Sequence, residues 1–222
     1  MNIEYNIQKI VENLPAGCRL VVVSKTQSPE RILEAYNAGQ RVFGENKVQE
    51  LSDKYATLPK DIEWHMIGHL QRNKVKHIAP FVDLIHSVDS GRLLEEIDKQ
   101  GARLSRIIPC LLQVYIAEEE TKFGFDADEV RALLQSPEMG ERRHVEIRGL
   151  MGMATFTNDE EKVRNEFRSL RRLFDELKTL SLPENVRLTE VSMGMSNDYP
   201  IAVAEGSTLI RVGTAIFGER MT

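Results

Sequence analysis

The feature that most constrains the fold is an alternation along the chain: short apolar runs typical of buried strands recur between longer amphipathic stretches typical of helices. The apolar runs predict strands at residues 20–24, 41–44, 63–67, 82–87, 108–114, 146–151, 188–192 and 208–212. The amphipathic stretches predict helices at residues 3–13, 29–39, 46–56, 71–79, 91–100, 127–135, 159–180 and 198–205. Thr157 or Asn158 is expected to cap the longest helix.

Eight strands separated by helices are what a (β/α)8 barrel requires, and a doubly wound open sheet is the competing architecture. The number of strands and the lack of a glycine-rich turn after the first strand favour the barrel. We therefore expect an α/β fold with a single TIM-barrel domain over residues 1–222 and an extra N-terminal helix. A very short helix should follow the last strand, and the N-terminal helix should cover part of that gap or the bottom of the barrel.

Charge and composition exclude several classes of partner. A net charge of −5 and a pI of about 5.7 disfavour binding to nucleic acid or to anionic membranes. The N-terminal segment contains no continuous apolar stretch of the kind found in signal peptides, and no later run reaches membrane-spanning length. Cys18 and Cys110 are expected to be reduced thiols. We expect a cytoplasmic protein.

The first predicted strand ends in Lys25, whose side chain shares the face of Val21 and Val23 if the strand alternation continues. An amine at the rim of an apolar barrel loses hydration, which favours its neutral, nucleophilic form. Taken alone, the run is interpreted more simply as a strand that ends in a solvated lysine.

Two turns rich in small residues follow the seventh and eighth predicted strands. The first spans residues 192–198 and contains Ser192 and Ser196; the second spans residues 211–215 and contains Gly213 and Thr214. Glycine allows close backbone approach to an anion, and hydroxyl and backbone N–H groups donate to it. One such turn is weak evidence, but two on adjacent barrel strands converge on one point, where barrels commonly bind phosphate.

Arg211 interrupts an apolar strand, and a guanidinium inside a barrel needs a partner because it cannot shed its charge. An ion pair with Glu45 or Glu190 is the structural alternative. A nucleophilic lysine, a phosphate site and an arginine in one cavity indicate a phosphorylated carbonyl compound. Pyridoxal 5′-phosphate (PLP) fits, with an aldehyde for Lys25, a phosphate for the two turns and a ring nitrogen for Arg211.

Six segments in order along the chain resemble the pyridoxal-phosphate homeostasis family (YggS/PROSC type), which is similar to the N-terminal barrel of alanine racemase, PLP fold type III. They are VVSKT at 22–26, FGEN at 43–46, WHMIGHLQRNK at 64–74, GLM at 149–151, SMGMSND at 192–198, and residues 206–218.

The resemblance implies a role for each matching position. Lys25 would form the internal aldimine with PLP, and Arg211 would face the pyridine nitrogen. The remaining implied cofactor-binding residues are the phosphate positions Ser196, Gly213 and Thr214, the polar neighbour Asn46, and Ser192 and Met193 beside the phosphate turn. Met151 or Met153, at the end of the sixth strand, could pack on the ring or belong to the core.

His65 and His69 have the i, i+4 interval of a metal pair, but they lie where a strand turns into a loop, and the glutamate of a zincin helix is missing. We expect no metal site. His65 is expected to line the cofactor pocket, and His69 to lie in an exposed loop.

Racemases of the resembling fold use the lysine and a tyrosine from the second domain of a partner subunit as their two bases. We expect this 222-residue chain to lack that domain, and none of its five tyrosines lies in a segment that matches the second base. The expected function is therefore to hold PLP as an aldimine on Lys25 and to act in intracellular PLP (vitamin B6) and amino-acid homeostasis, without robust catalysis.

We expect a monomer, with PLP-dependent apo-enzymes as candidate recipients of the cofactor. Two enzymatic alternatives remain open: a single-domain PLP-dependent amino-acid racemase with a nonstandard second base, and an aldolase that uses Lys25 directly on a sugar phosphate.

Overall fold

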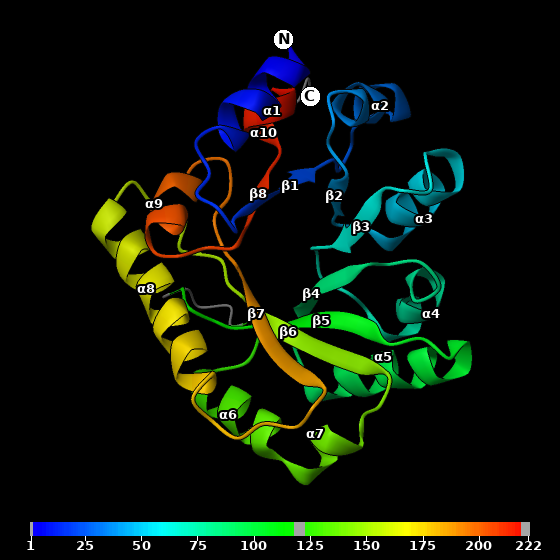
Figure 1. The fold of residues 1–222 in the computed structure, drawn as a ribbon, viewed down its shortest axis with the longest axis vertical. Coiled ribbons are helices and arrows are strands. Elements are labelled where there is room, and N and C mark those ends of the chain that lie inside the picture. The colour runs from blue at the N-terminus through cyan, green and yellow to red at the C-terminus, as the bar shows by residue number, and fades with distance from the viewer. Residues whose placement is uncertain (1, 118–122, 219–222) are drawn as a thin grey trace.

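The predicted barrel is present in the computed structural model, which describes residues 2–117 and 123–218. Its eight strands are hydrogen-bonded in sequence order, every neighbouring pair is parallel, and β8 returns to β1 to close the sheet (Figure 1). The strands are β1 Arg19–Val23, β2 Val42–Glu45, β3 Glu63–Met66, β4 Leu84–Val88, β5 Ile108–Gln113, β6 Val145–Met151, β7 Val186–Ser192 and β8 Leu209–Val212. Each lies within two residues of its predicted position.

The helices run outside the strands. They are α1 Ile3–Val11, α2 Pro29–Asn37, α3 Val48–Thr57, the 3-10 helix η1 Arg72–Lys74, α4 Val75–Ile78, α5 Gly91–Leu104, α6 Ala127–Gln135, α7 Pro137–Glu141, α8 Glu160–Leu177, α9 Tyr199–Ala204 and α10 Thr214–Phe217. Within the described part of the chain, no helix is both long enough and apolar enough to cross a membrane.

The helix predictions differ from the structure at residues 71–79, where the 3-10 helix η1 precedes the short helix α4, at α7 and at the start of α8. The short helix α7 was not predicted; it begins because the Ser136 hydroxyl, at the end of α6, accepts a hydrogen bond from the Met139 N–H and Pro137 occupies the first turn. The cap of α8 is Asp159, whose carboxylate accepts from the Lys162 N–H at 3.1 Å. The Thr157 hydroxyl instead accepts a hydrogen bond from the N–H of Asp159, the cap residue itself.

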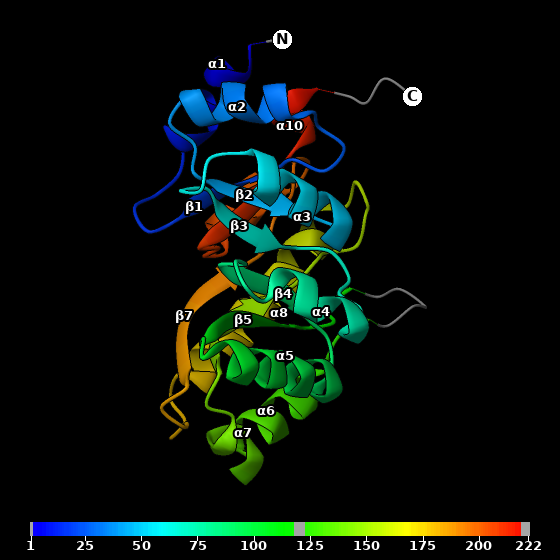
Figure 2. The same ribbon diagram turned by 90° about the vertical axis from the view of Figure 1, so that its right-hand side faces the viewer.

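The N-terminal helix compensates for the short helix that ends the barrel. Figures 1 and 2 show α1, α2 and α10 together at one end of the molecule, and α1 contacts both neighbours. The Asn6 side-chain amide donates to the Ile216 carbonyl at 2.9 Å, which fixes α1 on α10. Of the two expected places for α1, the gap beside the last strand is the one it occupies.

The strands alternate between two apolar layers. Six buried residues, one from each of six strands, form a cluster of their own: Val21, Val42, Leu84, Leu111, Met151 and Leu209. Their strand neighbours, including Val22 and Phe43, belong instead to the larger core that contains the helices. We infer that the six-residue cluster fills the barrel interior, as layered side chains do in TIM barrels. Arg211 is the register partner of Val21 and faces the same interior.

Gly149 lies where β6 shifts register against both of its neighbours. Its φ is +153°, and an added Cβ would meet the Glu190 carbonyl oxygen at 1.7 Å. Only glycine therefore allows β6 and β7 to approach here, directly before the end of β6.

We expect Gly149→Ala to lower the free energy of unfolding by more than about 3 kcal/mol, because relieving the overlap requires separating two central strands. Urea denaturation followed by circular dichroism measures this. Gly140→Ala is the matched control, since its Cβ would meet nothing closer than 3.7 Å. A loss for Gly149→Ala no larger than that of the control would contradict the close packing.

Candidate functional site

A cavity of about 320 Å³ opens where the carboxyl ends of β1, β7 and β8 meet. Barrels place their functional sites at this end of the strands. The predicted site residues that line the cavity are Lys25, Asn46, Ser196, Arg211, Gly213 and Thr214. Its remaining walls are Val23, Gln27, Ile67, Met153, Phe156, Met195, Asn197, Asp198 and Gly218.

Lys25 follows a backbone position that is held by a buried ion pair. The Lys54 ammonium, on α3, donates to the Ser24 carbonyl at 2.8 Å and to Glu45 Oε1, on β2, at 2.7 Å. The Ser24 hydroxyl donates to the same carboxylate oxygen at 2.6 Å. Burial raises the pKa of Glu45, while Lys54 and Ser24 favour its ionised form. This cluster of Ser24, Glu45 and Lys54, the clamp, fixes the end of β1.

The residue after Lys25 is also constrained. Thr26 has a φ of +64°, which is unusual for a β-branched residue, and its N–H donates to Glu50 Oε2 at 2.8 Å. Val21 lies in the barrel interior and Val23 lines the cavity, so the face alternation predicted for β1 is present. Lys25 is half-buried and lines the same cavity.

The two predicted anion-binding turns converge. The N–H groups of Gly213 and Ala215 both point at the Ser196 hydroxyl, over N···O distances of 3.3 and 3.5 Å. A Cβ on residue 213 would come within 3.0 Å of the Val23 carbonyl, so glycine permits the turn to lie against β1. Asp198 holds the other turn, because its carboxylate accepts the Met195 N–H. Burial raises the pKa of Asp198, against the effects of that hydrogen bond and of Arg211.

Arg211 is buried, with 4% of its surface exposed, and its guanidinium is held by neutral acceptors. Nη1 donates to Ser192 Oγ at 2.6 Å and Nη2 to the Gly152 carbonyl at 3.0 Å. Burial lowers the pKa of Arg211 to about 10, with Asp198 acting in the opposite direction, so it stays charged at neutral pH.

The ion-pair alternative for Arg211 was wrong. Glu45 belongs to the clamp, and Glu190 pairs with Arg19 over 3.2 Å and accepts from the Thr208 hydroxyl. The positive charge of Arg211 therefore faces the cavity without a carboxylate in hydrogen-bond contact among the described residues.

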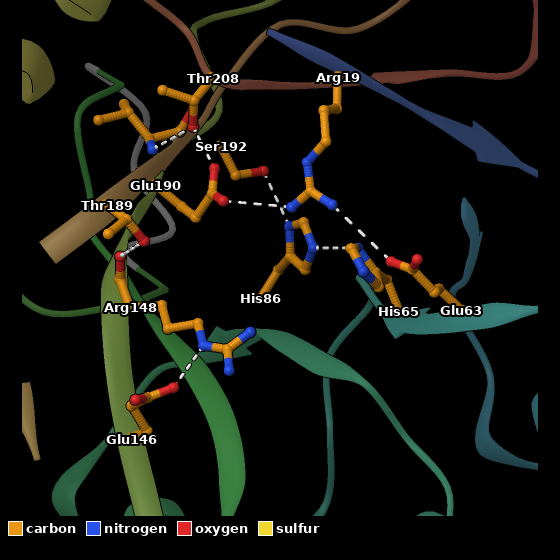
Figure 3. Close-up of polar contacts among 11 residues, drawn as sticks. Arg19, Glu63, His65, His86, Glu146, Arg148, Thr189, Glu190, Ser192 and Thr208 are labelled. Atoms are coloured by element: carbon orange, nitrogen blue, oxygen red, sulfur yellow. Dashed lines mark hydrogen bonds and ion pairs between the residues drawn. The ribbon is translucent and has the colours of Figure 1, made fainter. Parts of the chain in front are cut away.

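Three predicted site residues lie behind the cavity wall. Ser192 is fully buried beneath Arg211, and Met193 is fully buried in the core that packs the helices. His65 is also buried and does not line the cavity; its Nδ1 lies 2.9 Å from Nε2 of His86 (Figure 3). Of these three, Ser192 and His65 belong to the polar groups buried inside the barrel, whereas Met193 packs outside it against the helices.

His69 lies apart from His65. Its side chain is exposed, and Nδ1 contacts Asp89 at 3.1 Å. Among the described residues, no group of three or more His, Cys, Asp or Glu side chains is arranged to hold a metal.

Sequence reasoning missed His86. It lies in the apolar strand β4, two residues after the interior residue Leu84, and is fully buried. A polar side chain on the inward face of an apolar strand was the signal that identified Arg211, and it could have identified His86. Of the two methionines considered, Met153 lines the cavity and Met151 belongs to the interior cluster.

Asn46 also lines a neighbouring cavity of about 370 Å³ beside α3. Lys47 and Lys74 belong to that cavity and not to the one that contains Lys25.

Comparison with known sequences gives matches over nearly the full chain. A family model described as "Alanine racemase, N-terminal domain" matches residues 1–221. The pyridoxal phosphate homeostasis protein of Aquifex aeolicus is 42% identical over 218 residues, which cover 96% of this chain and 93% of that protein. The human protein of the same name is 38% identical, with coverages of 91% and 76%.

Comparison with solved structures also gives matches over nearly the full chain. PipY of Synechococcus elongatus PCC7942 without PLP superposes with a TM-score of 0.91 at 41% identity, covering 97% of this chain and 100% of PipY. The PLP-bound form of PipY has a TM-score of 0.87 at 40% identity, with the same coverages. Alanine racemase from Bartonella henselae, with covalently bound pyridoxal phosphate, shares the fold at 18% identity and a TM-score of 0.70; the match covers all of this chain and 61% of the racemase.

The clamp beneath Lys25 gives a stability prediction. Lys54→Met leaves the Glu45 carboxylate buried beside Ser24 with no cation, and we expect the free energy of unfolding to fall by about 3–5 kcal/mol. Urea denaturation measures the change. The double variant Lys54→Met/Glu45→Gln removes the stranded charge and should recover part of the loss; a double variant less stable than the single one would contradict this account.

Proposed function

Because this chain belongs to the family of pyridoxal phosphate homeostasis proteins, which share the barrel of the alanine racemase N-terminal domain, we propose that its cavity binds pyridoxal 5′-phosphate. Lys25 is the covalent anchor, through a Schiff base between Nζ and the cofactor aldehyde. The observation that carries the proposal is that Lys25, two converging anion-binding turns and the buried charge of Arg211 all line one cavity.

The residues present fit the chemistry of PLP. Gly213 and Ala215 supply backbone N–H groups beside the Ser196 hydroxyl, and with Thr214 they form the candidate phosphate site. Arg211 is a buried cation with neutral partners, so an acceptor in the cavity would stabilise it. Bound PLP supplies an electrophilic aldehyde and a conjugated ring that withdraws electrons.

Each group of the chain has a separate task. The clamp and Glu50 hold the backbone on both sides of Lys25, which limits the directions in which its amine can extend. The guanidinium of Arg211 has donors only and keeps its proton at neutral pH, so it would hydrogen-bond to an unprotonated ring nitrogen. Asn46 lines the cavity from the start of the β2–α3 connection and offers an amide to the cofactor.

We propose a homeostatic role in PLP and amino-acid metabolism, without robust catalysis, for one domain that acts as a cytosolic monomer and passes PLP to apo-enzymes. A racemase needs a second base opposite the lysine. Among the described residues that line the cavity there is no tyrosine, histidine or cysteine, and the one carboxylate, Asp198, is engaged by the loop after β7. The names of the relatives, which describe homeostasis, support the same proposal.

Borohydride reduction of the protein mixed with PLP tests the anchor. We expect one stoichiometric label, mapped by peptide mass spectrometry to Lys25, and a visible absorption band before reduction. Lys25→Ala should lose both the label and the band. Lys47→Ala, which changes a lysine of the neighbouring cavity, should keep them. Stoichiometric labelling of another lysine would contradict the site, and turnover of a sugar phosphate without the band would favour the aldolase.

Racemisation tests the absence of robust catalysis. Protein loaded with PLP is incubated with L-alanine, and the D-enantiomer is followed by chiral chromatography. We expect no turnover above that of Lys25→Ala incubated with PLP in parallel. Steady racemisation that requires Lys25 would establish the racemase alternative, and its loss in Asp198→Asn would identify the second base.

A further inference from the structure

A continuous chain of hydrogen bonds runs from the cavity floor into the barrel interior. Arg211 Nη1 contacts Ser192 Oγ at 2.6 Å, Ser192 Oγ contacts His86 Nδ1 at 2.8 Å, and His86 Nε2 contacts His65 Nδ1 at 2.9 Å. Figure 3 shows His86 between Ser192 and His65. The members come from β8, β7, β4 and β3, and none has more than 4% of its surface exposed.

The first link fixes the direction of the second. A guanidinium only donates, so Ser192 Oγ accepts from Arg211. Among the described residues, the other side-chain partner of that hydroxyl is His86. If His86 donated to Ser192, the hydroxyl proton would be buried without an acceptor, which is costly. Ser192 therefore donates to Nδ1 of His86.

The same logic fixes the imidazoles. His86 has no proton on Nδ1, so its proton is on Nε2 and is donated to Nδ1 of His65. His65 in turn carries its proton on Nε2. Every hydrogen bond then points away from Arg211, and both rings are neutral.

The charges around the chain favour this neutral state. Burial lowers the pKa of His86 well below its ordinary value, with His65, Arg211 and Arg19 adding to the effect. Burial also lowers the pKa of His65 to about 3, with Arg19 and Arg148 adding. The nearby carboxylates are committed elsewhere, as Figure 3 shows: Glu63 and Glu190 pair with Arg19, and Glu146 pairs with Arg148.

We propose that His86 is a positioning residue for Arg211. His86 accepts the hydrogen bond of the Ser192 hydroxyl and thereby orients a lone pair of Ser192 Oγ toward Arg211 Nη1. The remaining N–H groups of the guanidinium are then directed into the cavity. This inference rests on the proposed PLP site, because the consequence of orienting Arg211 is the hydrogen bond that it offers to the cofactor ring.

The proton arrangement is tested without cofactor. In protein labelled with 15N histidine, NMR should show His86 as the neutral Nε2–H tautomer from pH 6 to pH 8, with the signal assigned by its loss in His86→Asn. An Nδ1–H tautomer or an imidazolium at this position would overturn the proposed chain.

The positioning role is tested in the PLP-loaded protein. His86→Leu removes the acceptor, and we expect a shifted absorption maximum of the lysine-bound cofactor and roughly tenfold weaker apparent PLP affinity, the factor that one ordinary hydrogen bond represents. His86→Asn retains an acceptor near the position of Nδ1 and should restore both properties. Ile85→Val, a packing change on the same strand, should leave both unchanged.

Ser192→Ala breaks the chain at its middle and gives a second test if His86→Leu fails to fold. Ser192→Ala alone should reproduce the spectral shift. Where His86→Leu folds, adding it to Ser192→Ala should produce no further shift. An unchanged spectrum in Ser192→Ala overturns the positioning role. If the wild-type protein binds no PLP, the proposed function fails and the positioning role fails with it, whereas the tautomer of His86 is still decided by the NMR experiment.

Discussion

The buried positive charge of Arg211 is the constraint on which the rest of the site depends. A guanidinium cannot lose its charge at neutral pH, and burial without partners would cost far more than the net stability of a domain allows. Ser192 and the Gly152 carbonyl satisfy two of its donors, and neither is charged. The positive charge is therefore directed toward the cavity, where an electron-rich ligand would compensate it.

Closure of the barrel brings Lys25 and the candidate phosphate site next to Arg211. The parallel pairing of β1 with β8 places Val21 beside Arg211. Lys25 lies four residues after Val21, beyond the carboxyl end of β1, and therefore lines the same cavity as Arg211. The β8–α10 turn follows Arg211 directly and meets Ser196 from the neighbouring strand connection. The clamp holds Ser24, the residue before Lys25, on the outer side of β1. The packing of α3 onto the barrel therefore determines the position of the Lys25 backbone. The amine, the candidate phosphate site and the guanidinium are thus positioned by three neighbouring strands.

The barrel and its strands could be predicted well from the sequence, because each buried parallel strand is a short run of apolar residues. Eight such runs separated by helices are specific for this fold. The sequence predicted the inward direction of Lys25 because strand alternation has a fixed period. It identified Arg211 because a charged residue interrupts an apolar strand directly before a turn of small residues. The failures have other causes. The cap of α8 was misassigned because Thr157, Asn158 and Asp159 can all act as caps, and the choice among them depends on the path of the chain into the helix. The short helix α7 was missed because five residues carry too little periodicity to be recognised. His65 was expected to line the cofactor pocket and Ser192 to border the phosphate turn, whereas both are buried behind the cavity wall, because alternation gives the face of a residue and not its depth in the barrel. Depth depends on how the strands are staggered when they close, and only the folded barrel specifies it.

The central claim is that a charged, donor-only Arg211 faces the ring of pyridoxal 5′-phosphate held on Lys25. Its most direct test is the NMR chemical shift of the ring nitrogen, measured with 15N-labelled PLP bound to the protein between pH 6 and pH 8. We predict the shift of an unprotonated pyridine nitrogen that accepts a hydrogen bond, constant over this range and altered in Arg211→Lys. The shift of a protonated pyridinium, unaffected by that substitution, would contradict the account.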